Sequence, residues 1–174
     1  VQERNDIHFR SDETELIDTL DDNQFQLDRM DRLMQRLLRQ KEFYIDSVTL
    51  TASASPEGSY RHNTALAQAR AYALRDYLRA KHGRCIDTLV RIGTLAENWV
   101  ELASQIEHDS LIRHRKQIIR IIASEHDPDR REERIREVYP EDYRYIREKI
   151  YPHLRSVIIR YDLRRVGMIK DTIH

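Results

Sequence analysis

The sequence predicts an α/β (α+β) sandwich, a small mixed sheet of about four strands packed by helices, with a helical insertion before the last strand. Two runs, at 45–52 and 156–163, alternate apolar and polar residues as a half-buried strand does. Two other segments, which begin near Asn23 and near Ser59, carry apolar residues at helical spacing. Because strands and helices alternate along the chain, we expect the helices to cover the sheet.

Length and charge narrow the class of protein. The chain has 174 residues, which fits a single domain over 1–174. Lys and Arg together number 30, and so do Asp and Glu, so the formal net charge is zero. A balanced charge argues against a nucleic-acid binder and against a polybasic membrane-surface module. No stretch has the roughly 18 apolar residues of a membrane helix, so we expect no direct membrane insertion by this segment.

The first elements are a short strand and a helix. We expect the strand near 7–9, and the polar cluster Asp21–Asn23 predicts the start of the helix. The apolar stripe of this helix consists of Leu27, Met30, Met34, Leu37 and Leu38. Four arginines lie mostly off the stripe, at Arg29, Arg32, Arg36 and Arg39. The stripe therefore faces the core, and the arginines lie away from it.

A strand, a turn and a long helix follow. In the strand 45–52, β-branched and apolar residues alternate with threonines. Ser55-Pro56-Glu57-Gly58 is a turn sequence, with Pro suited to its second position and Gly to its fourth. A helix is expected from about residue 59 or 60 to 81, and Gly83 is well placed to end it.

The second half of the chain is mostly helical. A short strand is expected at 89–92, and several helices over about 99–150 form the insertion. Pro140 suits the first turn of the last of these helices. The run 156–163 then returns to the sheet as a strand with one buried face.

Two polar residues fall inside the apolar stripe of the helix 59–81. On a helical wheel with Leu66 at zero and an advance of about 100° per residue, Arg70 lies at about 40° and Asn63 at about 60°. A buried guanidinium needs partners, and the strand-to-helix loop before residue 59 is the nearest source. An inward Arg beside a loop and a helix N-terminus predicts a carboxylate-binding pocket. The alternative stays open that Arg70 bonds loop carbonyls and Glu57 and only holds the loop in place.

The residues around this helix resemble a known family. The matching positions are the turn glycine Gly58, then Asn63, Leu66 and the pair Arg70-Ala71, with Tyr77-Leu78 and Gly83 further on and Arg155 just before the last strand. In this pattern the sequence resembles the OmpA-like C-terminal domain. The resemblance implies a βαβαβ-type fold. It also implies non-covalent, non-enzymatic binding of peptidoglycan on the periplasmic face of the outer membrane.

In that family, the helix Arg holds the carboxylate of diaminopimelate and a turn Asp holds its ammonium group. The resemblance therefore implies a ligand site of Ser55, Glu57, Gly58, Asn63, Arg70 and Arg155. The chain departs from the pattern at Ser55, which stands where the family has the Asp, and Glu57 could supply a carboxylate instead. The Ser-Pro-Glu-Gly turn is similar to variants in Bacteroidetes envelope proteins. On this reading, Arg70→Lys folds nearly normally and loses binding.

The remaining histidine, cysteine and tryptophan residues do not indicate a further functional site. The eight histidines show no spacing typical of a metal site, so we expect no metal and no cofactor. The single cysteine, Cys85, excludes an internal disulfide and is expected to be packed. Trp99 is expected in the core rather than as a sugar platform. No nucleophile–base motif indicates an enzyme.

Two functions remain open at the level of the sequence. The first is a peptidoglycan anchor, and because the sequence begins at Val1 without Met, we expect a fragment of a longer envelope protein. The second is a degenerate domain of the same fold that binds another envelope protein through 99–150. The first predicts a polar, partly open pocket at Arg70, and the second predicts Arg70 closed off by Glu57.

Overall fold

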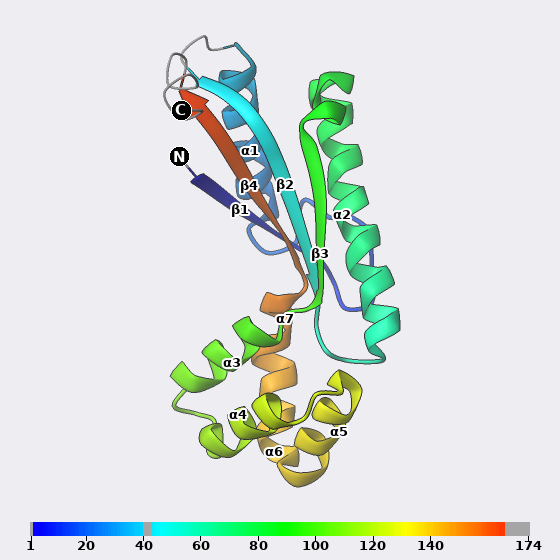
Figure 1. The fold of residues 1–174 in the computed structure, drawn as a ribbon, viewed down its shortest axis with the longest axis vertical. Helices are drawn as coiled ribbons and strands as arrows, with labels where there is room; N and C mark the ends of the chain where they lie inside the picture. Colours follow the sequence, from blue (N-terminus) through cyan, green and yellow to red (C-terminus); the bar gives the residue numbers. More distant parts are fainter. Residues whose placement is uncertain (1, 40–42, 166–174) are drawn as a thin grey trace, which may run out of the picture.

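Four strands form one mixed sheet in the computed structural model, which describes residues 2–39 and 43–165. The strands are β1 (Gln2–His8), β2 (Phe43–Ala54), β3 (Val90–Glu97) and β4 (Ser156–Arg165), in the spatial order β1-β4-β2-β3. β2 and β3 are parallel, and β4 is antiparallel to both β1 and β2. The predicted fold class, a small mixed sheet packed by helices, is confirmed (Figure 1).

Two helices, α1 (Asn23–Arg39) and α2 (Tyr60–His82), cover one face of this sheet (Figure 1). The predicted stripe of α1 is confirmed at Leu27, Met30, Met34 and Leu37, all of which are buried. Leu38 is an exception because 40% of its surface is exposed. Leu38 lies about 100° around the helix axis from the buried Leu37, which places it beyond the edge of the stripe on the solvent side of the helix.

All four strands are longer than the sequence indicated, since β2 and β4 also extend beyond the predicted ranges 45–52 and 156–163. β1 begins at Gln2 rather than near Ile7, because its pairing with β4 orders a polar stretch that has no apolar alternation. β3 continues to Glu97 rather than ending near Ile92. Its register with β2 shifts after Ala52, which pairs with Thr94, so that Ser53 pairs with Ala96. This bulge adds twist at the end of the sheet that leads into the helical part.

The helices after β3 form a second apolar core. They are α3 (Trp99–His108), α4 (Arg115–Ser124), α5 (Pro128–Val138), α6 (Pro140–Tyr145), a π-helical segment η2 (Ile146–Ile150) and α7 (Tyr151–Leu154). Their buried side chains pack on one another and form a cluster separate from the one under the sheet. Figure 1 shows these helices gathered below the end of the sheet where β3 ends and β4 begins.

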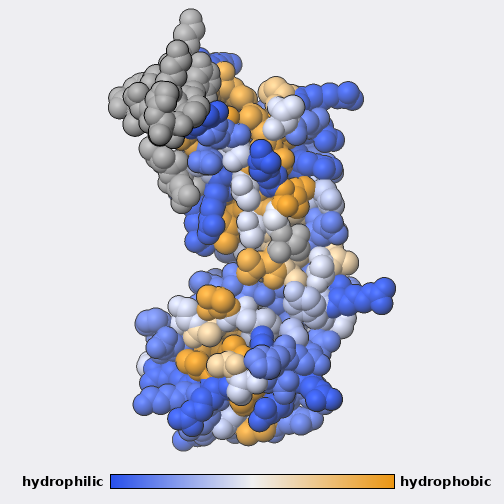
Figure 2. Space-filling model, viewed as in Figure 1, coloured by the Kyte–Doolittle hydropathy of each residue, from blue (hydrophilic) through white to orange (hydrophobic). Residues whose placement is uncertain are grey.

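The face seen in Figure 2 is largely hydrophilic, with separate apolar patches over both the sheet and the helical part. Trp99 is buried in the helical core, as predicted. The prediction that Cys85 is packed is wrong, because it lies exposed in the short 3₁₀ helix η1 (Arg84–Thr88), where the chain leaves α2 at the protein surface. Over residues 2–39 and 43–165, no helix is long and apolar enough to span a bilayer, and no cluster of potential metal ligands occurs.

Candidate ligand-binding end of the sheet

The loop from β2 to α2 forms one wall of the candidate site. Gly58 has φ 80°, a left-handed conformation that favours glycine, and it turns the chain into the helix. Ser59 then caps α2, because its side chain accepts a hydrogen bond from the backbone N–H of His62 at 3.0 Å. The predicted turn therefore places Ser55 and Glu57 directly before the N-terminus of α2.

Asn63 is buried one turn into α2 and bonds two different segments. Its Nδ2 donates to the backbone carbonyl of Glu57 at 2.8 Å and to Oε2 of Glu97 at 2.7 Å. The other carboxylate oxygen of Glu97 accepts from the indole N–H of Trp99 at 2.9 Å. Burial raises the pKa of Glu97, although the bonds from Asn63 and Trp99 oppose that shift.

Glu97 did not stand out from the sequence, although it belongs to this site. The parallel pairing of β2 with β3 sets Ala54 opposite Glu97, so the ends of the two strands meet beside α2. A buried Asn63 requires an acceptor, and the end of the next parallel strand is the place to seek one. That signal depends on knowing that β3 reaches residue 97.

Arg155 closes the site from the other side, where α7 passes into β4. Its Nη2 donates to Oε1 of Glu57 at 2.6 Å, and its Nε donates to the hydroxyl of Ser55 at 3.2 Å. Arg155 and Glu57 are both partly buried, with side chains 13% and 34% exposed. The pair is thus partly shielded from water, and it fixes the turn relative to β4.

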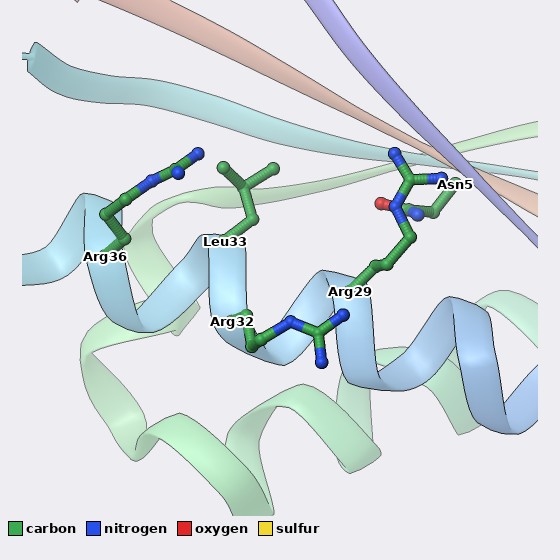
Figure 3. Close-up of a pocket in the computed structure, with 5 residues that line it drawn as sticks. All are labelled: Asn5, Arg29, Arg32, Leu33 and Arg36. Atoms are coloured by element: carbon green, nitrogen blue, oxygen red, sulfur yellow. The ribbon is translucent and has the colours of Figure 1, made fainter.

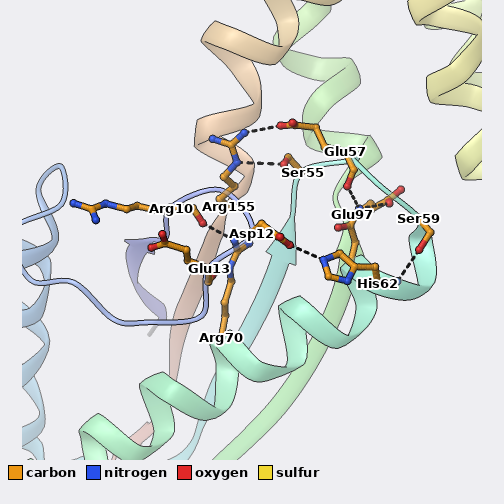
Figure 4. A network of polar contacts seen from close by, with 11 residues as sticks. Arg10, Asp12, Glu13, Ser55, Glu57, Ser59, His62, Arg70, Glu97 and Arg155 are labelled. Carbon is orange, nitrogen blue, oxygen red and sulfur yellow. Dashed lines mark hydrogen bonds and ion pairs between the residues drawn. The ribbon is translucent and has the colours of Figure 1, made fainter.

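Arg70 is completely buried and points from α2 toward the loop between β1 and α1 (Figure 4). Its Nε donates to the carbonyl of Glu13 at 2.9 Å, its Nη2 to that of Arg10 at 2.9 Å, and its Nη1 to that of Ser53 at 3.2 Å. The guanidinium also lies 5.4 Å from the centre of the Phe9 ring. Burial, with the nearby cation of Arg155 adding to it, lowers the pKa of Arg70 to about 10.

Neither predicted environment of Arg70 is found. It does not line an open pocket, because the loop of residues 10–13 covers it, and the contact of His62 with Asp12 at 2.6 Å holds that loop to α2. It does not bond Glu57 either, because Arg155 takes that carboxylate. Of the three carbonyl acceptors of Arg70, only Ser53 belongs to the predicted strand-to-helix stretch, because Glu13 and Arg10 lie in the loop between β1 and α1.

The predicted site residues therefore divide into two groups. Ser55, Glu57, Asn63 and Arg155 join in one network with Glu97, and Gly58 lies in the turn beside it. Figure 4 shows Ser55, Glu57, Glu97 and Arg155 of this network. Arg70 reaches the same end of the sheet through the carbonyl of Ser53 but bonds a different loop. The arrangement offers two cations and two carboxylates within one polar end of the sheet, which suits a zwitterionic ligand.

The helical part contacts this end as well. Asp129 on α5 accepts a hydrogen bond from the backbone N–H of Tyr60, the first residue of α2, at 2.8 Å. The guanidinium of Arg131 lies 4.8 Å from the centre of the Trp99 ring. Sequence patterns did not reveal these contacts, because each joins two distant segments, 69 residues apart for Tyr60 and Asp129, whose own periodicity is satisfied locally.

The fold and the site together define a class of small mixed-sheet domain with a polar end between β2, α2 and β4. Among solved structures, a similar one is the peptidoglycan-associated lipoprotein from Burkholderia pseudomallei. The match has a TM-score of 0.51 and 15% sequence identity, and it covers 91% of this chain and 90% of that chain. The chain therefore has the OmpA-like fold of this neighbour. Neither a protein-family model nor a curated protein matches the sequence.

Proposed function

We propose that this chain is a non-enzymatic domain of the cell envelope that binds peptidoglycan and anchors a larger outer-membrane or periplasmic protein. The fold that it shares with a peptidoglycan-associated lipoprotein supports this class. One observation carries the site. Arg70 is a fully buried cation at the polar end of the sheet, and no carboxylate in residues 2–39 and 43–165 forms an ion pair with it. A buried cation is costly, and a ligand carboxylate would supply the missing countercharge.

The proposed ligand is the diaminopimelate of a stem peptide. Arg70 takes its carboxylate, and Glu57 with Ser55 receives its ammonium group, while Gly58 and Asn63 shape the turn and Arg155 positions Glu57. Because residues 10–13 cover Arg70, binding requires this loop to move and the ligand to replace the carbonyls of Arg10 and Glu13. The guanidinium has five N–H groups and uses three of them in its present bonds. It can therefore donate to the ligand carboxylate before it releases the loop carbonyls.

A second candidate is an interaction module of the envelope in which the ligand site is degenerate. The three carbonyl bonds of Arg70 favour it, because they are the bonds of a residue that holds a loop. So do three apolar side chains on the helical part, Val100, Leu111 and Val138, which are 82%, 69% and 57% exposed. Under this reading the partner protein binds the helices over 99–150.

Binding to purified sacculi that contain diaminopimelate separates the two candidates. We expect the wild-type protein to sediment with sacculi and to be released by free diaminopimelate. Arg155→Gln removes the group that positions Glu57, and we expect it to weaken binding by about tenfold, the loss typical of one charge-assisted contact. Arg130→Gln, which removes an exposed cation on α5, is the matched control and should bind normally. Wild-type protein that fails to sediment, or that free diaminopimelate does not release, would leave the interaction module as the function.

A further inference from the structure

Three arginines of α1 line one cavity on the side of the molecule away from the proposed peptidoglycan site. Arg29, Arg32 and Arg36 are exposed, and with Leu33 and Asn5 they surround a space of about 490 Å³. Figure 3 shows Arg29 reaching from α1 to Asn5 on β1, with Leu33 and Arg36 further along the same helix. The cavity therefore lies between a helix and the strand at the edge of the sheet.

These arginines are not paired with carboxylates in the part of the chain that the structure describes. Throughout residues 2–39 and 43–165, no ion pair joins Arg29, Arg32 or Arg36 to an acidic side chain. The aspartates of the same helix are engaged elsewhere. Asp31 bonds Tyr77 and His82, and Asp28 accepts a bond from Gln24. A chain with a formal net charge of zero thus carries a local basic groove that attracts an anionic ligand.

The strand beside the groove has a free edge. β1 is the first strand in the order β1-β4-β2-β3, and it pairs only with β4 within the part of the chain that the structure describes. Its outer backbone N–H and C=O groups are therefore open to another extended chain. Asn5 points toward the helices and into the cavity, so alternate side chains of an added strand would face α1.

We infer that this groove binds an extended acidic segment of another protein, which adds to the edge of β1 as a fifth strand. Backbone hydrogen bonds to β1 supply the pairing, and acidic side chains at alternate positions reach Arg29, Arg32 and Arg36. The apolar side chain of Leu33 contacts the stems between the charges. The free strand edge favours a polypeptide over a phosphate-rich polymer, which would use the arginines and leave the edge unpaired.

The test uses a fluorescent peptide with Glu at alternate positions between Thr and Val residues. We expect anisotropy to show binding to the wild-type protein, and hydrogen exchange to show slower exchange over residues 2–8 when the peptide is bound. The triple variant Arg29→Gln, Arg32→Gln, Arg36→Gln should bind at least about tenfold more weakly, since each exposed pair contributes a factor of a few. The matched control Arg84→Gln, Arg91→Gln, Arg130→Gln removes the same charge from exposed sites elsewhere and should bind normally.

Two further peptides keep the test decisive. A peptide with Gln in place of Glu should lose binding, and so should one methylated on the backbone nitrogens that would pair with β1. Binding that survives methylation, or that leaves exchange of residues 2–8 unchanged, overturns strand addition in favour of a diffuse anion site. An equal loss in the control variant, or no binding to wild type, overturns the proposal. The triple variant is checked for its native far-ultraviolet circular dichroism, which Gln on an exposed helical face should preserve.

Discussion

The guanidinium of Arg70 is a buried cation whose three bonds all go to main-chain carbonyl oxygens. These carbonyls come from one loop, between β1 and α1, and from the end of β2, so the side chain joins both segments to α2. The place of Arg70 in the apolar stripe and the family resemblance together predict that Arg70→Lys folds nearly normally. The observed bonds give the same residue a structural role as well, because an ammonium group cannot reproduce a planar fork.

We therefore expect Arg70→Lys to lower the free energy of unfolding by about 2–4 kcal/mol, the cost of one or two lost bonds from a charged donor with buried acceptors left behind. Urea denaturation measures this change. Arg61→Lys on the exposed side of the same helix is the control and should change stability by less than about 0.5 kcal/mol. An unchanged stability of Arg70→Lys would mean that the loop of residues 10–13 does not depend on the guanidinium.

Glu132 is a buried carboxyl group in the helical core, and one of its oxygens finds no hydrogen-bond partner among residues 2–39 and 43–165. The hydroxyl of Tyr143 donates to the other oxygen at 3.0 Å, and Arg136 lies 3.8 Å from it. Burial outweighs both and raises the pKa of Glu132 to about 7. The folded protein therefore binds a proton here more tightly than the unfolded chain does.

It follows that Glu132 makes stability fall as the pH rises from about 4.5 to about 7, because the folded state must release a proton that the unfolded chain has already lost. Glu132→Gln removes this titration. Between pH 5 and pH 8, we expect the free energy of unfolding of the variant to rise by about 1–3 kcal/mol relative to that of the wild type. Urea denaturation at both pH values measures this difference. An equal pH dependence in both proteins would contradict the assignment.

At the scale of elements, α2 ends where only glycine fits without strain. Gly83 has φ 83° and ψ 179°, and its N–H closes the last turn by bonding the carbonyl of Arg79 at 2.8 Å. A Cβ at this position would meet no atom within 4 Å, so space is not the obstacle. The constraint is the backbone conformation itself.

Gly83→Ala should therefore destabilise the protein by about 1–3 kcal/mol through backbone strain alone. Gly93 on β3 offers a matched control, because a Cβ there would lie 3.6 Å from Thr51 Oγ1, an ordinary contact, and its φ is not positive. Gly93→Ala should be neutral or slightly stabilising in thermal unfolding. An equal loss of stability in Gly83→Ala and Gly93→Ala would contradict this prediction, because the loss would then not depend on the positive φ of Gly83.

Residues 2–39 and 43–165 form two apolar cores, and the chain passes between them at the candidate site. A single residue separates β3 from α3, and a single residue separates α7 from β4. The two parts are also connected by side-chain contacts of Glu97, Trp99, Asp129 and Arg131. Short connections and a shared polar network favour one cooperative unit over two independent ones. We therefore propose that residues 1–174 unfold as a single cooperative domain, as the sequence predicts.

Trp99 is the only tryptophan, and it lies in the helical core, so its fluorescence reports that part of the molecule. Leu74→Ala, which opens a cavity under the sheet, should cost about 2–5 kcal/mol. We expect it to shift the urea midpoint of Trp99 fluorescence as much as the midpoint of circular dichroism. A fluorescence midpoint that stays at the wild-type value would show that the helices unfold separately.

Elements with a local signal could be predicted from the amino-acid sequence. The stripe of Leu27, Met30 and Met34, the alternation in β2 and the glycine at position 58 each lie within one segment, and each is confirmed. Periodicity is a property of neighbouring residues, so it survives without any knowledge of the rest of the fold. The motif around Arg70 also indicated the fold that the solved neighbour shows.

Which polar groups meet depends on contacts between segments that are far apart in the sequence. Arg70 bonds the carbonyls of Glu13 and Arg10, which are 57 and 60 residues away, and Arg155 takes the carboxylate of Glu57. Backbone carbonyls occur at every residue, so composition cannot reveal which of them a buried donor finds. The extension of β1 and the place of Glu97 have the same origin, because pairing with a distant strand, and not local pattern, orders these residues.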